Sequence, residues 1–115
     1  MIDAAQIREI LSLYGKHGWT LRRVLLSDAL RTRISDQLET LFGAEAAFVT
    51  SEINALWFSR PSNGDGETWE IRHLSETPFA LVEVFSGEDD EEIREERRAE
   101  MEAELKERTA RNEKS

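Results

Sequence analysis

Residues 55–86 read ALWFSRPSNGDGETWEIRHLSETPFALVEVFS, three apolar runs separated by two turn sequences. The runs have the length of β-strands and are rich in aromatic and β-branched residues. The turn sequences contain proline, glycine, asparagine and serine, and they are too short for a crossover connection. We therefore predict an antiparallel meander with strands at residues 55–60, 67–74 and 79–86.

The alternation of side chains suggests a register for this meander. The simplest hairpins pair residue 60 with residue 67 and residue 74 with residue 79. One face is then a coherent core of Leu56, Phe58, Trp69, Ile71, Val82 and Val84. The other face carries Trp57, Leu74, Phe79, Leu81 and Phe85 together with Glu70, Arg72 and Glu83. A water-facing side should be mostly polar, so this second face needs a cover, either a helix of the same chain or a second copy.

We expect helices both before and after the meander along the chain. Asp3 and Gln6 have capping-box spacing at the start of a helix that ends at Gly15. Residues 19–26 are read as a strand, with a helix beginning at Thr20 as the competing interpretation. A helix over residues 28–42 and a short strand over residues 46–50 follow. The fold class is α+β.

Charge divides the chain into two parts. The net charge is −9, and residues 87–115 carry 12 acidic and 7 basic side chains. A capping-box pair, Asp89 and Glu92, begins a helix with sparse apolar positions there. We expect a globular domain at residues 1–87 and a charged helix at residues 88–115 that projects from it and frays at its end.

Composition excludes several classes of function. The negative net charge works against binding to nucleic acid or to an anionic membrane. Apolar runs do not exceed four residues, so we expect no membrane span, and the first residues do not resemble a secretory signal. The chain contains no cysteine, which fits a cytoplasmic location. No metal-ligand spacing and no cofactor motif is present, so we expect neither a metal nor a cofactor.

Glu70 and Glu83 form the candidate catalytic pair. In the register above they face each other, and like charges at this spacing raise one carboxyl pKa and permit acid–base chemistry. Arg72 could hold a substrate carboxylate or phosphate, and His73 lies near the strand end. The alternative interpretation is that Arg72 simply neutralises the two glutamates.

Arg22, Arg23, Arg31 and Arg33 form the basic cluster of the first half. One interpretation is a phosphate-binding patch beside Trp19. Against it, adjacent arginines on a strand point to opposite faces, and arginines on a helix face solvent. A third interpretation is that the cluster docks the acidic residues 87–115 of the same chain or of another chain.

The sequence favours a non-enzymatic protein-interaction module over an enzyme. We expect a homodimer joined through the face that carries Trp57, Leu74, Phe79, Leu81 and Phe85. The alternative is a small ligand-binding or hydrolase-like protein that uses Glu70, Glu83 and Arg72. In size, acidity and mixed α/β pattern the chain also resembles the small dimeric chaperones of bacterial secretion systems, although no motif carries that resemblance. The resemblance implies a binder of another protein.

Overall fold

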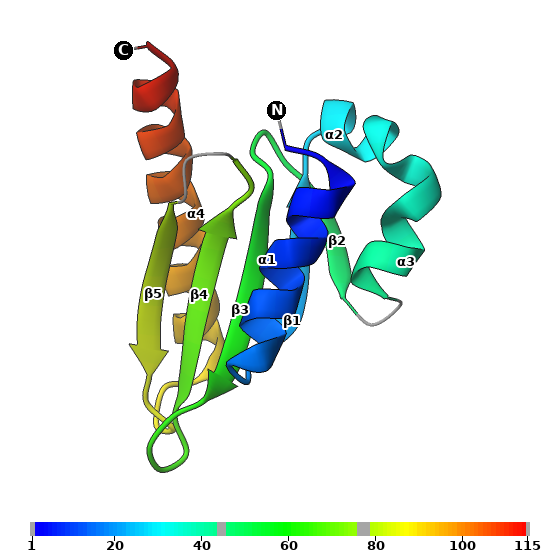
Figure 1. Cartoon of the computed structure of the whole chain (residues 1–115). Helices are drawn as coiled ribbons and strands as arrows, with labels where there is room; N and C mark the ends of the chain where they lie inside the picture. Colours follow the sequence, from blue (N-terminus) through cyan, green and yellow to red (C-terminus); the bar gives the residue numbers. More distant parts are fainter. Residues whose placement is uncertain (1, 44–45, 76–78, 115) are drawn as a thin grey trace.

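The chain has the α+β fold that the sequence predicts (Figure 1). The computed structural model describes residues 2–43, 46–75 and 79–114, with the backbone alone for residues 111–114. The elements in chain order are α1 (Ala4–Lys16), β1 (Thr20–Leu26), α2 (Asp28–Arg33), η1 (Ser35–Gln37), α3 (Leu38–Phe42), β2 (Ala47–Thr50), β3 (Ala55–Pro61), β4 (Glu67–His73), β5 (Ala80–Phe85) and α4 (Glu91–Lys114). Residues 76–78 of the turn predicted at residues 75–78, and the last residue of the predicted fraying end, Ser115, lie outside what is described, whereas the backbone of α4 is helical through Lys114.

The structure decides between the two interpretations of the segment after α1 and corrects the extent of the helix that follows it. Residues 20–26 form a strand, so the helical interpretation of this segment is wrong. The helix expected over residues 28–42 is broken into α2, η1 and α3. Ser35 and Asp36 stand at the break, and both residue types disfavour a helix interior because their side chains compete for backbone hydrogen bonds.

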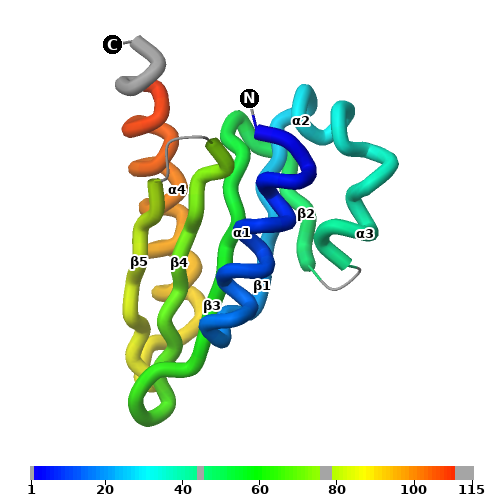
Figure 2. Tube along the Cα trace, in the orientation of Figure 1, coloured from blue at the N-terminus to red at the C-terminus, as the bar shows by residue number. Residues whose placement is uncertain are grey.

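The strands form one five-stranded sheet in the order β2-β1-β3-β4-β5. β1 and β2 run parallel, joined by the crossover through α2, η1 and α3, and every other pair is antiparallel. The meander therefore occupies one half of a larger sheet, with β2 and β5 as the two edges. Figure 2 shows the same path as a continuous trace.

The predicted register of the meander is wrong by one residue in both hairpins. In the first hairpin Pro61, rather than Arg60, pairs with Glu67, which places Trp57 opposite Ile71. The loop is thus one residue shorter than its turn residues suggest. Side chains alternate between the two faces of a strand. A shift of one residue therefore sets each side chain beside partners that were predicted to lie on the opposite face.

The loop of the second hairpin is instead one residue longer than its turn residues suggest. The Leu74 N–H points to β3, where it donates to the Asn54 carbonyl at 2.8 Å and extends the β3–β4 register by one pair. His73 then closes the hairpin in its place, and its N–H donates to the Phe79 carbonyl at 2.8 Å. Leu74 therefore belongs to the loop of the second hairpin, and the turn residues alone do not show where that loop begins.

The two faces of the sheet are covered by different helices. In Figure 1, α1 lies in front of β1 and β3, and α4 runs behind β4 and β5. On the α1 side, Ile7 of α1 is buried against the sheet and Leu11 is partly buried there. The core on this side consists mainly of Ile2, Ile7, Val24, Leu26, Leu30, Ile34, Phe42, Leu56, Phe58 and Leu74. Capping by Asp3 and Gln6, as predicted from their spacing, fixes the start of α1.

The core on the α4 side corrects the expectation of a projecting helix. It consists of Leu25, Ile53, Ala55, Trp57, Trp69, Ile71, Phe85, Met101 and Leu105. Met101 and Leu105 of α4 are buried, so the helix up to Leu105 is part of the fold. Within the described part of the chain, none of the helices has the length and hydropathy that a membrane crossing requires.

Candidate functional site

The predicted carboxylate pair does not exist, because Glu70 and Glu83 lie on opposite faces of the sheet. Glu70 pairs with Val82 across the β4–β5 ladder, and Glu83 pairs with Trp69. Glu83 lies on the α4 side, where its carboxylate accepts a hydrogen bond from Arg97 Nε at 2.5 Å. No shared proton or like-charge repulsion connects two carboxylates that the sheet separates.

Tyr14 of α1 is the partner of Glu70. Its hydroxyl donates a hydrogen bond to the Glu70 carboxylate, and its ring stacks on Phe58 with a centroid distance of 4.0 Å. Burial, followed by the hydrogen bond and charge of Glu70, raises the pKa of Tyr14 above its ordinary value. The neutral phenol is therefore favoured, and the contact fixes α1 to the sheet.

Titration of Tyr14 provides a direct test, because it is the single tyrosine of the chain. The raised pKa means that its contribution to stability is complete below about pH 10, the ordinary value, and is lost as the pH rises through the folded-state pKa. We expect tyrosinate absorbance to appear only well above pH 10, together with unfolding. In Glu70→Gln the midpoint should fall but stay above that of free tyrosine, because the burial remains. A midpoint near pH 10 in the folded wild type would show that the contact does not form.

Arg72 and His73 are also separated from each other. Arg72 shares the α1 side with Glu70, two residues along β4, and its buried Nε atom has no hydrogen-bond partner within the described residues. His73 lies on the α4 side, and its Nδ1 is 3.0 Å from Ser75 Oγ. The four candidate catalytic residues thus form no single constellation. The described residues also contain no group of three or more side chains suited to hold a metal ion.

A β-bulge reorganises the basic cluster. The pairing of β1 with β3 shifts between Leu21 and Arg23, so Arg22 is the extra residue of the bulge. As a result both arginines lie near the Trp69 ring, with guanidinium-to-centroid distances of 5.5 Å for Arg22 and 5.8 Å for Arg23. The expectation that these neighbours point to opposite faces is wrong for this reason.

The other two arginines of the cluster lie elsewhere. Arg31 and Arg33 belong to α2, and Arg33 Nη2 donates to the Ile2 carbonyl. Arg23 instead bonds Glu95 of α4 through both terminal nitrogens, at 3.0 and 2.6 Å. This hydrogen bond lowers the pKa of Glu95. The interpretation that the cluster docks the acidic residues of the same chain is confirmed for Arg23, whereas a four-arginine phosphate patch is not formed.

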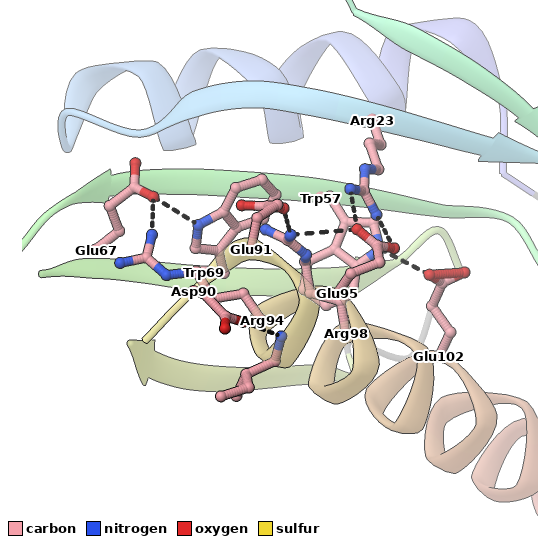
Figure 3. Close-up of polar contacts among 11 residues, drawn as sticks. Arg23, Trp57, Glu67, Trp69, Asp90, Glu91, Arg94, Glu95, Arg98 and Glu102 are labelled. Carbon is pink, nitrogen blue, oxygen red and sulfur yellow. Dashed lines mark hydrogen bonds and ion pairs between the residues drawn. The ribbon is translucent and has the colours of Figure 1, made fainter. Parts of the chain in front are cut away.

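A buried arginine at the centre of the α4 contact escaped the sequence analysis. Arg98 is 1% exposed, and its guanidinium lies 4.2 Å from the Trp69 ring centroid (Figure 3). Its Nη2 donates to Glu91 and to Glu95, the latter at 3.2 Å. Arg98 therefore occupies a core position of a helix whose apolar residues seemed too few to pack. The signal in the sequence was its spacing, three residues before Met101 and seven before Leu105.

Acidic groups satisfy the indole N–H groups on the same face. Trp57 Nε1 lies 3.4 Å from Glu102 Oε2, and Trp69 Nε1 lies 3.4 Å from Glu67 Oε1. Glu67 also accepts a hydrogen bond from Arg94 at 2.8 Å (Figure 3). A charged helix can cover an aromatic surface because tryptophan presents both an apolar ring and a polar N–H group.

The face predicted to join two copies is mostly closed within one chain. Trp57 is 0% exposed and Phe85 is 3% exposed, both under α4. Phe79 and Leu81 pack at the margin of the same core. Leu74 is buried in the core on the α1 side. The apolar second face does require a cover, as the sequence indicates, and α4 is that cover.

The open surface lies on the other side of the meander. The side chains of Val82 and Val84 are 57% and 64% exposed, on the part of the sheet that α1 leaves uncovered in Figure 1. Ala80, in the same alternation, is also exposed. Because β5 is the last strand of the sheet, these three residues line an edge as well as a face.

Within the described residues, no strand pairs with the outer side of β5. Residues 73 and 79 form a hydrogen-bonded pair of the ladder, as the His73 N–H to Phe79 carbonyl contact shows. Such pairs recur at every second residue, so the odd-numbered residues of β5 bond to β4. The N–H and carbonyl groups of Ala80, Val82 and Val84 therefore point outward. We call these three residues the β5 edge.

Comparison of the chain with models of protein families, with curated proteins and with solved structures gave no match. The function must therefore be inferred from the geometry of this chain alone.

Proposed function

We propose that the protein is a non-enzymatic protein-interaction module that binds an extended segment by strand addition at the β5 edge. The observation that carries this proposal is the coincidence of outward-pointing backbone groups with the exposed Val82 and Val84 side chains. Strand addition uses these two elements, because main-chain hydrogen bonds provide affinity and alternate side chains provide specificity.

The β5 edge has few of the features that usually protect an edge strand. Proteins block such edges with charged side chains (lysine above all), proline, bulges or very short strands. Residues 80–85 contain no lysine or proline, and the β4–β5 pairing is regular over six residues. The one charged residue of the strand, Glu83, is on the α4 side and bonds Arg97. The opposite edge, β2, is four residues long and so offers less to a partner.

The alternative of a ligand-binding or hydrolase-like enzyme has weaker support. Its two carboxylates have separate partners on separate faces, Tyr14 for Glu70 and Arg97 for Glu83. A chaperone-like role in binding another protein remains compatible with the proposal, since an extended segment of a client would occupy the same edge.

A peptide strand can test the proposal on protein diluted until its mass in solution is that of one chain. We expect excess peptide of residues 79–86 to slow amide hydrogen exchange in residues 80–84 by about tenfold or more, measured by mass spectrometry. A tenfold change corresponds to about 1.4 kcal/mol. Exchange in α1 should not change. The control peptide has proline in place of Val82, which removes the central N–H and should give no protection. If neither this peptide nor other extended valine- and threonine-rich peptides slow exchange there, the proposed function is wrong.

A further inference from the structure

We infer that the segment bound at the β5 edge is the same strand of a second copy of this chain. In this arrangement two β5 strands pair antiparallel about a two-fold axis at Val82, and the two sheets become continuous. The inference rests on the proposed function, because it names the partner of that edge. It also moves the expected homodimer contact from the closed α4 face to the open edge.

The alternation of inward- and outward-pointing backbone groups along β5 determines which residues of the two copies can face each other. With the axis at Val82, each outward-pointing residue faces another outward-pointing residue, so Val82 faces its own copy and Ala80 faces Val84 of the second copy. Facing residues of this kind exchange two backbone hydrogen bonds. The side chains of all three are on the same, uncovered side of the sheet, so the valines of both copies form one continuous apolar strip.

Charge favours the register with the two-fold axis at Val82 over the register with the axis at Glu83. An axis at Val82 places Glu83 opposite Leu81 of the second copy. An axis at Glu83 preserves the backbone phase but sets Glu83 directly against its own copy, which is unfavourable for like charges. It also reduces from three to two the number of outward-pointing residues that pair within the strand, because Ala80 then faces Ser86, outside β5. The sequence of β5 is therefore self-complementary when centred on Val82.

The net charge of −9 would oppose self-association if it were concentrated at the contact. Within β5 itself the charge is small, because Glu83, the one charged residue of the strand, bonds Arg97, which also bonds Glu100 at 3.2 Å. Two further carboxylates near this edge, Asp89 and Glu96, line a surface hollow beside α4. Beside β5 the outer side of α4 exposes Ile93, at 52%, next to this hollow of about 400 Å³, which Glu83 and Arg97 also line. The second copy approaches this hollow and reduces the exposure of Ile93.

A charge-exchange experiment tests both the partner and the register. Wild-type protein should have twice the mass of one chain by sedimentation or light scattering at about 100 μM, in a range where edge pairing of μM affinity is populated. Val82→Lys and Val82→Glu should each be monomeric and folded, because each places like charges face to face across the axis. Mixed in equal amounts, the two variants should form the heterodimer, detected by native mass spectrometry. Leu13→Lys, at a 56% exposed site on α1, is the matched control and should stay dimeric.

Each outcome separates this inference from the proposed function. A monomeric wild type whose edge is still protected by the peptide would overturn the second-copy inference and leave strand addition intact. A Val82→Lys protein that dimerises as well as wild type would overturn the inference as well. Dimers of both single variants without preference for the heterodimer would mean that the contact lies away from Val82. If the variants fail to fold by circular dichroism, hydrogen exchange of the wild type at high and low concentration decides: residues 80–84 must be protected only when concentrated.

Discussion

A chain that ends at Asp90 should lose its cooperative fold, because the truncation removes α4 from the sheet. Four large side chains then lose their cover, namely Trp57, Trp69, Ile71 and Phe85. Burial of one such side chain contributes about 1.5–3 kcal/mol. Their combined contribution is similar to the whole stability of a small domain, about 5–15 kcal/mol. We expect urea unfolding without a sigmoidal transition, and aggregation in light scattering.

A shorter truncation is the matched control for this experiment. A chain that ends at Arg108 retains Met101 and Leu105, which are the buried apolar residues of α4. Its unfolding midpoint should remain close to that of the whole chain. Conversely, a soluble and cooperatively folding chain that ends at Asp90 would show that residues 91–115 are a dispensable tail, as their charge pattern suggests.

The elements of this fold could largely be predicted from sequence because their signals are local. The capping box of Asp3 and Gln6 and the turn residues after β3 act within a few residues of where they stand. Apolar residues at every position from 55 to 58 correctly indicate a strand buried on both sides, and β3 lies at the centre of the sheet. The need for two covering layers followed from that pattern.

The candidate catalytic site failed because it depended on register, which is not local. His73, and not Leu74, closes the second hairpin opposite Phe79, so Leu74 joins the loop. That one-residue change moves Glu70 and Glu83 from one face to two. The same shift exposes Val82 and Val84, which the sequence placed in the core. The surface that now suggests a function thus appears only when the register is known.

The sequence did not predict that α4 packs on the sheet, and the reason is chemical. Hydrophobic patterning counts arginine as a solvated residue, yet a guanidinium can stack on an aromatic ring and bury its alkyl stem. Arg98 does this over Trp69, which accounts for the sparse apolar positions of the helix.

Substitution of Arg98 should therefore depend on the shape of the replacement more than on its charge. Arg98→Ala leaves a cavity at a position that is 1% exposed and removes the contact with Trp69, for an expected loss of about 2–4 kcal/mol in the free energy of unfolding. Arg98→Met fills the same space without a charge to desolvate, and buried Nε of Arg98 has no hydrogen-bond partner within the described residues. Replacement of a buried ion pair by a well-packed apolar side chain is often neutral or stabilising, so we expect a change within about 1 kcal/mol.

The neighbouring Arg97 is the control that separates burial from charge. It also bonds carboxylates of Glu83 and Glu100, but its side chain is 37% exposed, and Arg97→Ala should cost less than about 1 kcal/mol. Urea unfolding of the variants measures all three changes. If Arg98→Met destabilises as strongly as Arg98→Ala, then the ionic contacts with Glu91 and Glu95 hold α4 in place, because cavity formation cannot account for the loss. If both changes are small, α4 does not depend on this position and its packing must come from Met101 and Leu105 alone.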